Sequence, residues 1–103
     1  MTTDRGWLQI DHSVVRKIAQ HAADQVHGVA TDRRGSNAKV HGTGDEVDLL
    51  LDLPLYYPAP VRSVVADVRE KVTAEIEHLT SYRVRAFEVT VSELLPDIPP
   101  RVR

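Results

Sequence analysis

Three carboxylates on one predicted strand are the first residues of this chain whose type and spacing could do chemistry. Glu46, Asp48 and Asp52 alternate with apolar residues and therefore share one strand face. Asp48 and Asp52 are about 13 Å apart at roughly 3.3 Å per residue. Carboxylate pairs in glycoside hydrolases are separated by roughly 5–9.5 Å. Glu46 and Asp48 are closer, at about 6.6 Å, but they lie at the exposed start of the strand, with no sign of an enclosing pocket. The pattern predicts a solvated surface and no acid–base pair.

Five histidines could suggest a metal site, but their spacing does not support one. They are His12, His21, His27, His41 and His78. None forms an i, i+4 pair, and the HExxH motif is absent. His27 and His41 could meet only if the glycine-rich segment between them folded back. The chain has no cysteine, which excludes thiol nucleophiles, disulfides and Cys-based zinc sites. We expect no metal and no other cofactor.

Motifs for nucleophilic catalysis and for phosphate binding are absent as well. The serines lack the G-x-S-x-G and S-x-x-K arrangements, and the glycines match no phosphate-binding loop. Arg33, Arg34 and Lys39 form a basic cluster, but Asp32 adjoins it and no aromatic residue is interleaved to stack bases. The formal net charge of -2 gives no global attraction to phosphate. We therefore expect no enzymatic activity, while a small nucleic-acid-binding domain stays open as the alternative and a small enzyme as a third hypothesis.

Hydrophobic periodicity predicts the elements that must position these residues. Strand alternation and 3.6-residue helical spacing predict six elements in the order β-α-β-β-α-β. The predicted strands are 6–10, 38–41, 46–55 and 82–93. The first helix is capped by Asp11 or Ser13 and stopped at Gly28, and the second helix is 61–79.

Proline and side-chain phase add detail to two of the strands. Pro54 cannot donate a ladder hydrogen bond, so pairing on that side of the strand should end about there. In the last strand Phe87, Val89 and Val91 are in phase, whereas Val84 has the opposite phase, which predicts a bulge near Arg85. The residues that share the inward phase predict the core, namely Leu8, Ile10, Ile18, Leu49, Leu51, Val65, Val68, Val72 and Val89.

Two helices with one apolar stripe each cover only one face of a small sheet. The predicted fold class is therefore an α+β two-layer sandwich with a small mixed or antiparallel sheet. The length of 103 residues indicates one domain over residues 6–95, between a flexible segment 1–5 and a proline-rich tail 96–103. No signal peptide or membrane-spanning run is recognisable, so we expect a soluble, cytoplasmic protein.

The sheet face that the helices leave uncovered is the predicted contact surface. Trp7 and Leu50 point to this face, and Tyr56 lies at its margin. Aromatic anchors are enriched at interface hot spots, so Trp7, Leu50 and Tyr56 are the candidate partner-binding residues. Alternatively, the tail from Pro96 onward folds over Trp7 and leaves a monomer.

Several segments of the chain together resemble the alkaline shock protein family of bacterial general-stress and cell-envelope-stress proteins. The resemblance covers residues 6 to about 93, and the segments that carry it are 6–19, 25–30, 38–40, 46–49, 61–72 and 87–91. It implies a non-enzymatic, self-associating protein that a membrane-anchored relative can tether. It implies no catalytic or cofactor-binding residue.

Overall fold

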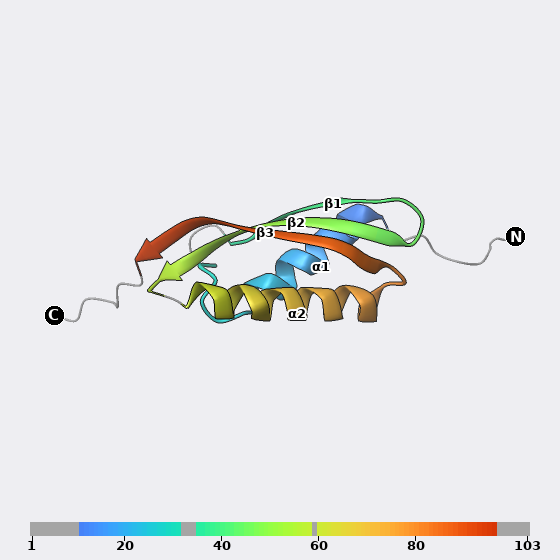
Figure 1. Ribbon diagram of the computed structural model, residues 1–103. Helices are drawn as coiled ribbons and strands as arrows, with labels where there is room; N and C mark the ends of the chain where they lie inside the picture. Colours follow the sequence, from blue (N-terminus) through green and yellow to red (C-terminus); the bar gives the residue numbers. More distant parts are fainter. Residues whose placement is uncertain (1–10, 32–34, 59, 97–103) are drawn as a thin grey trace, which may run out of the picture.

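The computed structural model describes residues 11–31, 35–58 and 60–96, and in these it shows two helices and three strands. In chain order they are α1 (His12–Asp24), β1 (Asn37–His41), β2 (Glu46–Tyr57), α2 (Val61–Leu79) and β3 (Arg83–Pro96). Both helices lie on one side of the sheet (Figure 1). The predicted α+β two-layer sandwich is thus confirmed. The predicted first strand, residues 6–10, lies outside the described residues.

The sheet is mixed, with the strand order β1-β2-β3. β1 pairs antiparallel with β2, and β2 pairs parallel with β3 over its whole length, from Glu46 opposite Arg83 to Tyr57 opposite Pro96. Because β2 and β3 are parallel, α2 runs back between them in the opposite direction. β2 is therefore the central strand of the described sheet, and β1 and β3 form its two edges.

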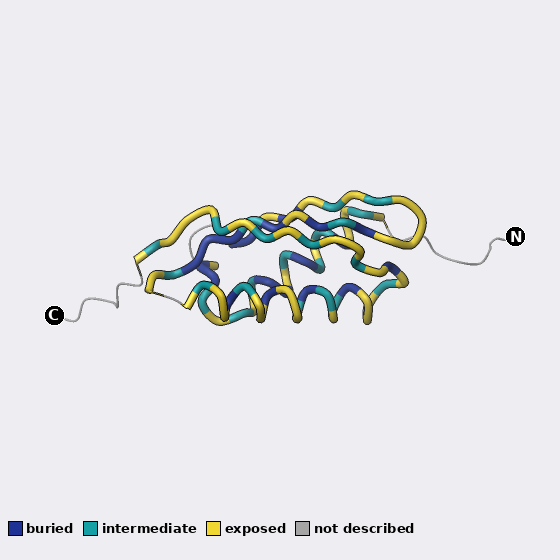
Figure 2. Tube along the Cα trace, in the orientation of Figure 1, coloured by how far each residue is buried: buried dark blue, intermediate teal, exposed yellow. Residues whose placement is uncertain are grey.

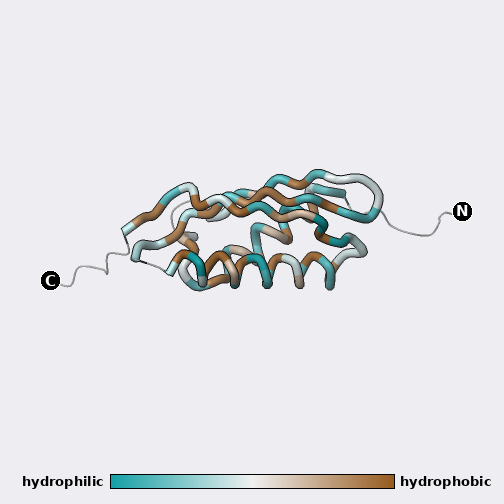
Figure 3. Tube along the Cα trace, in the orientation of Figure 1, coloured by the Kyte–Doolittle hydropathy of each residue, from teal (hydrophilic) through white to brown (hydrophobic). Residues whose placement is uncertain are grey.

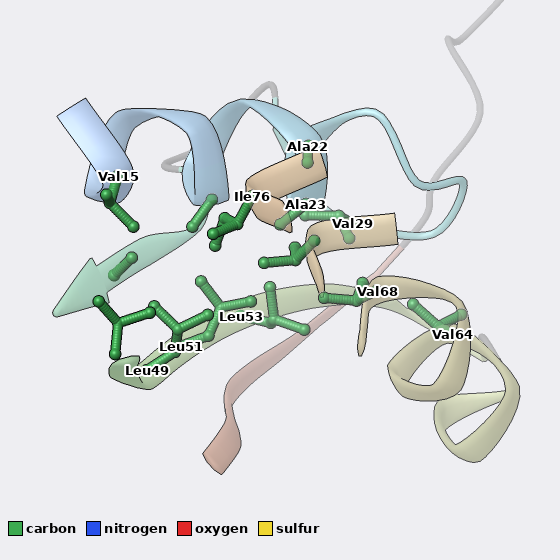
Figure 4. Packing of buried hydrophobic residues seen from close by; sticks show 14 of the residues in the cluster. Val15, Ala22, Ala23, Val29, Leu49, Leu51, Leu53, Val64, Val68 and Ile76 are labelled. Atoms are coloured by element: carbon green, nitrogen blue, oxygen red, sulfur yellow. The ribbon is translucent and has the colours of Figure 1, made fainter. Parts of the chain in front are cut away.

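The core forms where the apolar face of β2 meets the helices. Val47, Leu49, Leu51, Leu53 and Leu55 are each at most 2% exposed, as their alternation predicts. The helices contribute Val15, Ala19, Ala22, Ala23, Val64, Val68, Val72 and Ile76. Side chains from both helices and from β2 point toward one another (Figure 4). Figures 2 and 3 show the corresponding alternation along α2, where buried apolar segments alternate with exposed polar ones.

Three predicted core residues are only partly buried. Ile18, Val65 and Val89 are half-buried. Ile18 and Val65 each lie beside the fully buried positions of their helix, and Val89 lies on an edge strand. Leu8 and Ile10 lie outside the described residues.

The first helix begins as predicted but ends earlier. Asp11 is its N-cap and accepts a hydrogen bond from the Ser13 backbone N–H at 2.8 Å. The helix ends at Asp24 rather than at Gly28, because the chain turns there and joins the end of β2. The Gly28 carbonyl accepts from the Tyr56 N–H at 2.9 Å, and the Ala30 N–H donates to the Pro54 carbonyl at 2.8 Å.

β2 extends two residues past its predicted end, to Tyr57. Pairing with β1 stops at Asp52, but the antiparallel bridge between Val29 and Leu55 continues the pairing on that side, so it does not end at Pro54 as predicted. The Pro54 carbonyl faces Ala30, and the Pro54 nitrogen points the same way, so the missing donor lies on the side away from β3.

β3 contains the predicted bulge. The register passes from Val84 to Ala86 and skips Arg85, and a second, unpredicted shift skips Ser92. β3 continues to Pro96, three residues beyond its predicted end. The rest of the proline-rich tail lies outside the described residues.

Candidate functional site

Leu50 is exposed on the uncovered sheet face, as predicted, but its neighbours are polar. Its side chain is 39% exposed, whereas those of Leu49 and Leu51 are 2% exposed. The register places it between Lys39 of β1 and Glu88 of β3, both exposed. Leu50 is thus a single apolar side chain in a polar strip and not the centre of an apolar patch.

An ion pair on the same face fixes the charge state of one candidate carboxylate. Arg85 donates from Nε and Nη2 to the two Asp48 carboxylate oxygens, at 3.0 and 2.6 Å. These hydrogen bonds, followed by the attraction between the charges, hold the pKa of Asp48 below its usual value and raise that of Arg85. Asp48 therefore stays ionised and engaged, which does not suit a general acid. The bulge at Arg85 brings the guanidinium to this carboxylate.

The structure does not bring the predicted partner-binding residues together. Leu50 and Tyr56 are six residues apart on β2, about 20 Å along the strand. Tyr56 is half-buried and lines an open groove of about 690 Å³, here called the Tyr56 groove, at the opposite end of α1 from its N-cap. Trp7 lies outside the described residues, so its role stays a prediction.

The Tyr56 groove carries titratable groups without an arrangement for catalysis. Asp24, His27 and Asp67 line it. The Asp24 carboxylate accepts a hydrogen bond from the Ser36 backbone N–H at 2.9 Å, so it serves to anchor the chain after α1. Within the described parts of the chain, no hydrogen bond or ion pair joins these three residues to one another.

The two histidines that a folded-back loop could have joined lie far apart. His41 is opposite Asp48 at the start of β2, whereas residue 28, next to His27, bonds to Tyr56 near its end. Eight residues of strand separate these positions, about 26 Å. Across residues 11–31, 35–58 and 60–96 no group of three or more His, Cys, Asp or Glu could hold a metal ion. The expectation that the chain has no resident metal stays a prediction.

An edge that the sequence analysis did not identify is the most distinctive surface. Phe87, Val89 and Val91 point toward the helix layer, yet each is only half-buried, because no described strand lies beyond β3. We call the backbone groups of residues 86–91 that face away from β2, together with these three side chains, the β3 edge. The sequence showed that the three residues are in phase. It did not show which strand would be outermost, because strand order is a tertiary property.

Two side chains of α2 reach the outer backbone of β3. The Arg69 Nη1 donates to the Phe87 carbonyl at 2.9 Å, and its guanidinium lies 5.6 Å from the centre of the Phe87 ring. The Glu77 carboxylate accepts from the Val84 N–H at 3.1 Å. Charged groups commonly protect edge strands in this way. Here they act at Val84 and Phe87, which leaves Val89 and Val91 as the next outward positions.

A second hollow adjoins this edge. It has a volume of about 300 Å³ and is lined by Val61, Arg62, Val65, Ala66 and Arg69. Val61, Val65 and Arg69 follow one another at i, i+4 spacing and so form one row on α2. Because Arg69 reaches the β3 edge, the row faces outward on that same side of the molecule.

The structure describes only one residue of the predicted basic cluster. Arg33 and Arg34 lie outside the described residues, and Lys39 is on β1, beside Leu50. Of the helices described, neither has the length and apolar character needed to cross a membrane.

Solved structures similar to this chain include forms of the MamM CTD. A nickel form of one variant has a TM-score of 0.63 and 18% identity, covering 79% of this chain and 96% of its own. A copper form of another variant has a TM-score of 0.57 and 18% identity, with coverage of 81% and 98%. A second structure of the first variant has a TM-score of 0.64 and 17% identity, with coverage of 88% and 100%. At such identities the likeness shows a shared fold.

These comparisons correct the predicted family. No protein-family model matches the chain, and no curated protein matches it. The similar folds are MamM CTDs and not alkaline shock proteins, so the proposed resemblance to that family was wrong. Its segments follow hydrophobic spacing, which any α+β sandwich with this order of elements shares. What the comparisons establish for this chain is the α+β fold of the MamM CTD.

Proposed function

We propose that this domain is a non-enzymatic interaction module that associates with a second copy of itself. The observation that carries the proposal is the β3 edge. Phe87, Val89 and Val91 lie on the same sheet face as the buried leucines of β2. The leucines are fully buried, whereas these three side chains are only half-buried. A strand with outward backbone groups and incompletely covered apolar side chains is suited to pairing with another strand.

The rest of the described surface supports a binding role over a catalytic one. Asp48 is held by Arg85, Asp24 anchors a backbone N–H, and the Tyr56 groove brings no base to a nucleophile. Nickel and copper are named for forms of the MamM CTD, and metal binding is not part of this proposal. A tether to a membrane-anchored relative and a cytoplasmic location remain predictions. A role in envelope stress rested on the family assignment and is withdrawn.

Sedimentation velocity of the purified chain over a wide range of concentrations tests the proposal. We expect the sedimentation coefficient to rise with concentration toward that of a dimer. Raising the salt concentration should leave the association in place, because burial of apolar surface does not depend on ion release. Phosphate-dominated binding to added RNA would instead weaken steeply with salt. A chain that sediments as a monomer at every concentration contradicts the proposal.

A further inference from the structure

We infer that the β3 edge pairs antiparallel with the β3 edge of a second copy, with Val89 on the two-fold axis. This inference rests on the proposed self-association and adds to it the surface, the strand direction and the register. Three independent observations support it. They are the direction of the outward backbone groups, the order of charges along β3, and the position of the outward row on α2 formed by Val61, Val65 and Arg69.

The backbone geometry determines which residues can pair. The Phe87 carbonyl points away from β2, because it accepts a hydrogen bond from Arg69. Backbone direction alternates along a strand, so Val89 and Val91 present their N–H and C=O groups on the same side. The bulges at Arg85 and Ser92 bound a regular stretch of residues 86–91. A second strand can therefore pair only over this stretch.

The charges on β3 favour an antiparallel copy of the same strand. Arg83 and Arg85 precede the regular stretch, whereas Glu88 lies within it and Glu93 follows it. When the strand is turned around on itself, the basic end of each copy meets the acidic end of the other. Pairing opposite charges across strands is stabilising, and pairing like charges is destabilising.

The register follows from the same rule. If Val89 lies opposite its own copy, Phe87 lies opposite Val91 and Glu88 opposite Thr90 of the second copy. A register shifted by one residue on each strand, with Glu88 facing its own copy, places two like charges side by side. The alternative centre at Thr90 places Phe87 opposite residue 93, which the bulge at Ser92 separates from the regular stretch. The centre at Val89 avoids both.

The row on α2 has its midpoint at the same level. Val89 is two residues beyond Phe87, about 6.6 Å along β3. α2 runs in the opposite direction, and Val65 is four residues before Arg69, about 6 Å along the helix. Val65 is thus level with Val89, so the two-fold axis brings the apolar part of one row toward that of the other. Arg69 then faces Val61 of the second copy and not another arginine.

Arg69 does not block this arrangement. A backbone carbonyl oxygen has two lone pairs, so the Phe87 carbonyl can keep the Arg69 guanidinium and still accept from Val91 of the second copy. The outward groups of Val89 remain for the pairing itself.

Because the chain has no cysteine, pairs of single-thiol variants can test the register by cross-linking. Glu88→Cys and Thr90→Cys place thiols on a non-hydrogen-bonded pair, with Cα atoms about 4.5 Å apart, within the range that a disulfide spans. Mild oxidation of a mixture should give a covalent heterodimer in high yield. Each variant alone should cross-link several-fold less, since its own copy is a diagonal neighbour about 7–8 Å away. Lys39→Cys, at the opposite edge of the sheet, is the control.

Charge substitutions at one exposed position give a second readout. Thr90→Lys should tighten the dimer about two- to tenfold, and Thr90→Glu should weaken it by a similar factor, because each places its charge opposite Glu88 twice in a symmetric dimer. Thermal unfolding of the monomeric protein at low concentration shows whether each variant is folded.

The outcomes separate the two proposals. A dimer that cross-links from the mixed variants and responds to charge in opposite directions supports both. If the protein dimerises but Lys39→Cys cross-links with the same yield as the mixture, self-association is retained and the β3 register is overturned. A persistent monomer, which is expected if the chain's own residues outside the described ranges occupy the edge, overturns both.

Discussion

Two neighbouring leucines of β2 provide a sharp test of the fold. Leu51 is 2% exposed and packs in the core, whereas Leu50 is 39% exposed on the opposite sheet face. Leu51→Ala removes the same atoms as Leu50→Ala, one residue away on the same strand. The two variants therefore share their loss of strand propensity and differ mainly in burial.

The expected difference in stability is large. Truncation of a buried leucine to alanine costs about 2–5 kcal/mol, because the apolar transfer energy is lost and a cavity remains. A domain of this size has about 5–15 kcal/mol in total. Leu50→Ala should cost less than about 1 kcal/mol, since its side chain is partly in water and its neighbours Lys39 and Glu88 are long.

Urea unfolding followed by far-UV circular dichroism measures both values. All chains should be compared at one low concentration, because self-association would stabilise the folded state by mass action. The midpoint should fall strongly for Leu51→Ala and little for Leu50→Ala, with the slope unchanged. Equal losses of stability in the two variants would refute the assignment of the two sheet faces. They would also contradict the exposure of Leu50 on the uncovered face.

Further substitutions test α2, the turn after α1 and the ion pair. Val68→Asp should prevent folding or cost several kcal/mol, because Val68 is fully buried and a carboxylate there has no partner; a melting temperature equal to the parent's would contradict the helix phase. Gly28→Ala should lower the melting temperature, because Gly28 has φ 107° and an added Cβ would lie 2.9 Å from Val64 Cγ2; an unchanged or higher value would contradict that backbone conformation. Asp48→Asn should remove part of the acid sensitivity. The folded-state pKa of Asp48 is below its ordinary value of 3.8, so its ion pair with Arg85 stabilises the fold above that pH and is lost as the pH falls through the lower value. Unfolding curves between neutral and strongly acidic pH should therefore lose stability less steeply in the variant, and parallel curves would show that the pair contributes nothing.

The local sequence pattern was sufficient to predict features that depend on a single helix or strand. The alternation in β2 predicted all five of its buried residues on the helix-facing side, because a half-buried strand must separate its faces. The phase conflict between Val84 and Phe87 predicted the bulge at Arg85, since only an extra residue reconciles two phases in one strand. Asp11 was predicted as a helix cap from its side-chain chemistry.

Pattern failed where a distant segment decided the outcome. Gly28 is a good helix stop by composition, but α1 ends four residues earlier, since residues 28–30 bond to the end of β2. Leu50 and Tyr56 have the same parity, yet parity carries no information about distance along a strand. Strand order placed β3 at an edge, and no single-strand pattern contains that order.

The two edges of the described sheet differ in a way that limits assembly. β1 is five residues long and exposes Lys39 at its middle, which are features that discourage pairing. β3 is fourteen residues long, but its bulges leave only residues 86–91 regular. Antiparallel pairing of this stretch with its own copy uses the same surface on both molecules, so the contact is closed and cannot propagate. In the proposed dimer the β3 edge is therefore occupied, and only the short edge at β1 remains exposed. This arrangement permits a dimer and opposes open-ended growth of the sheet.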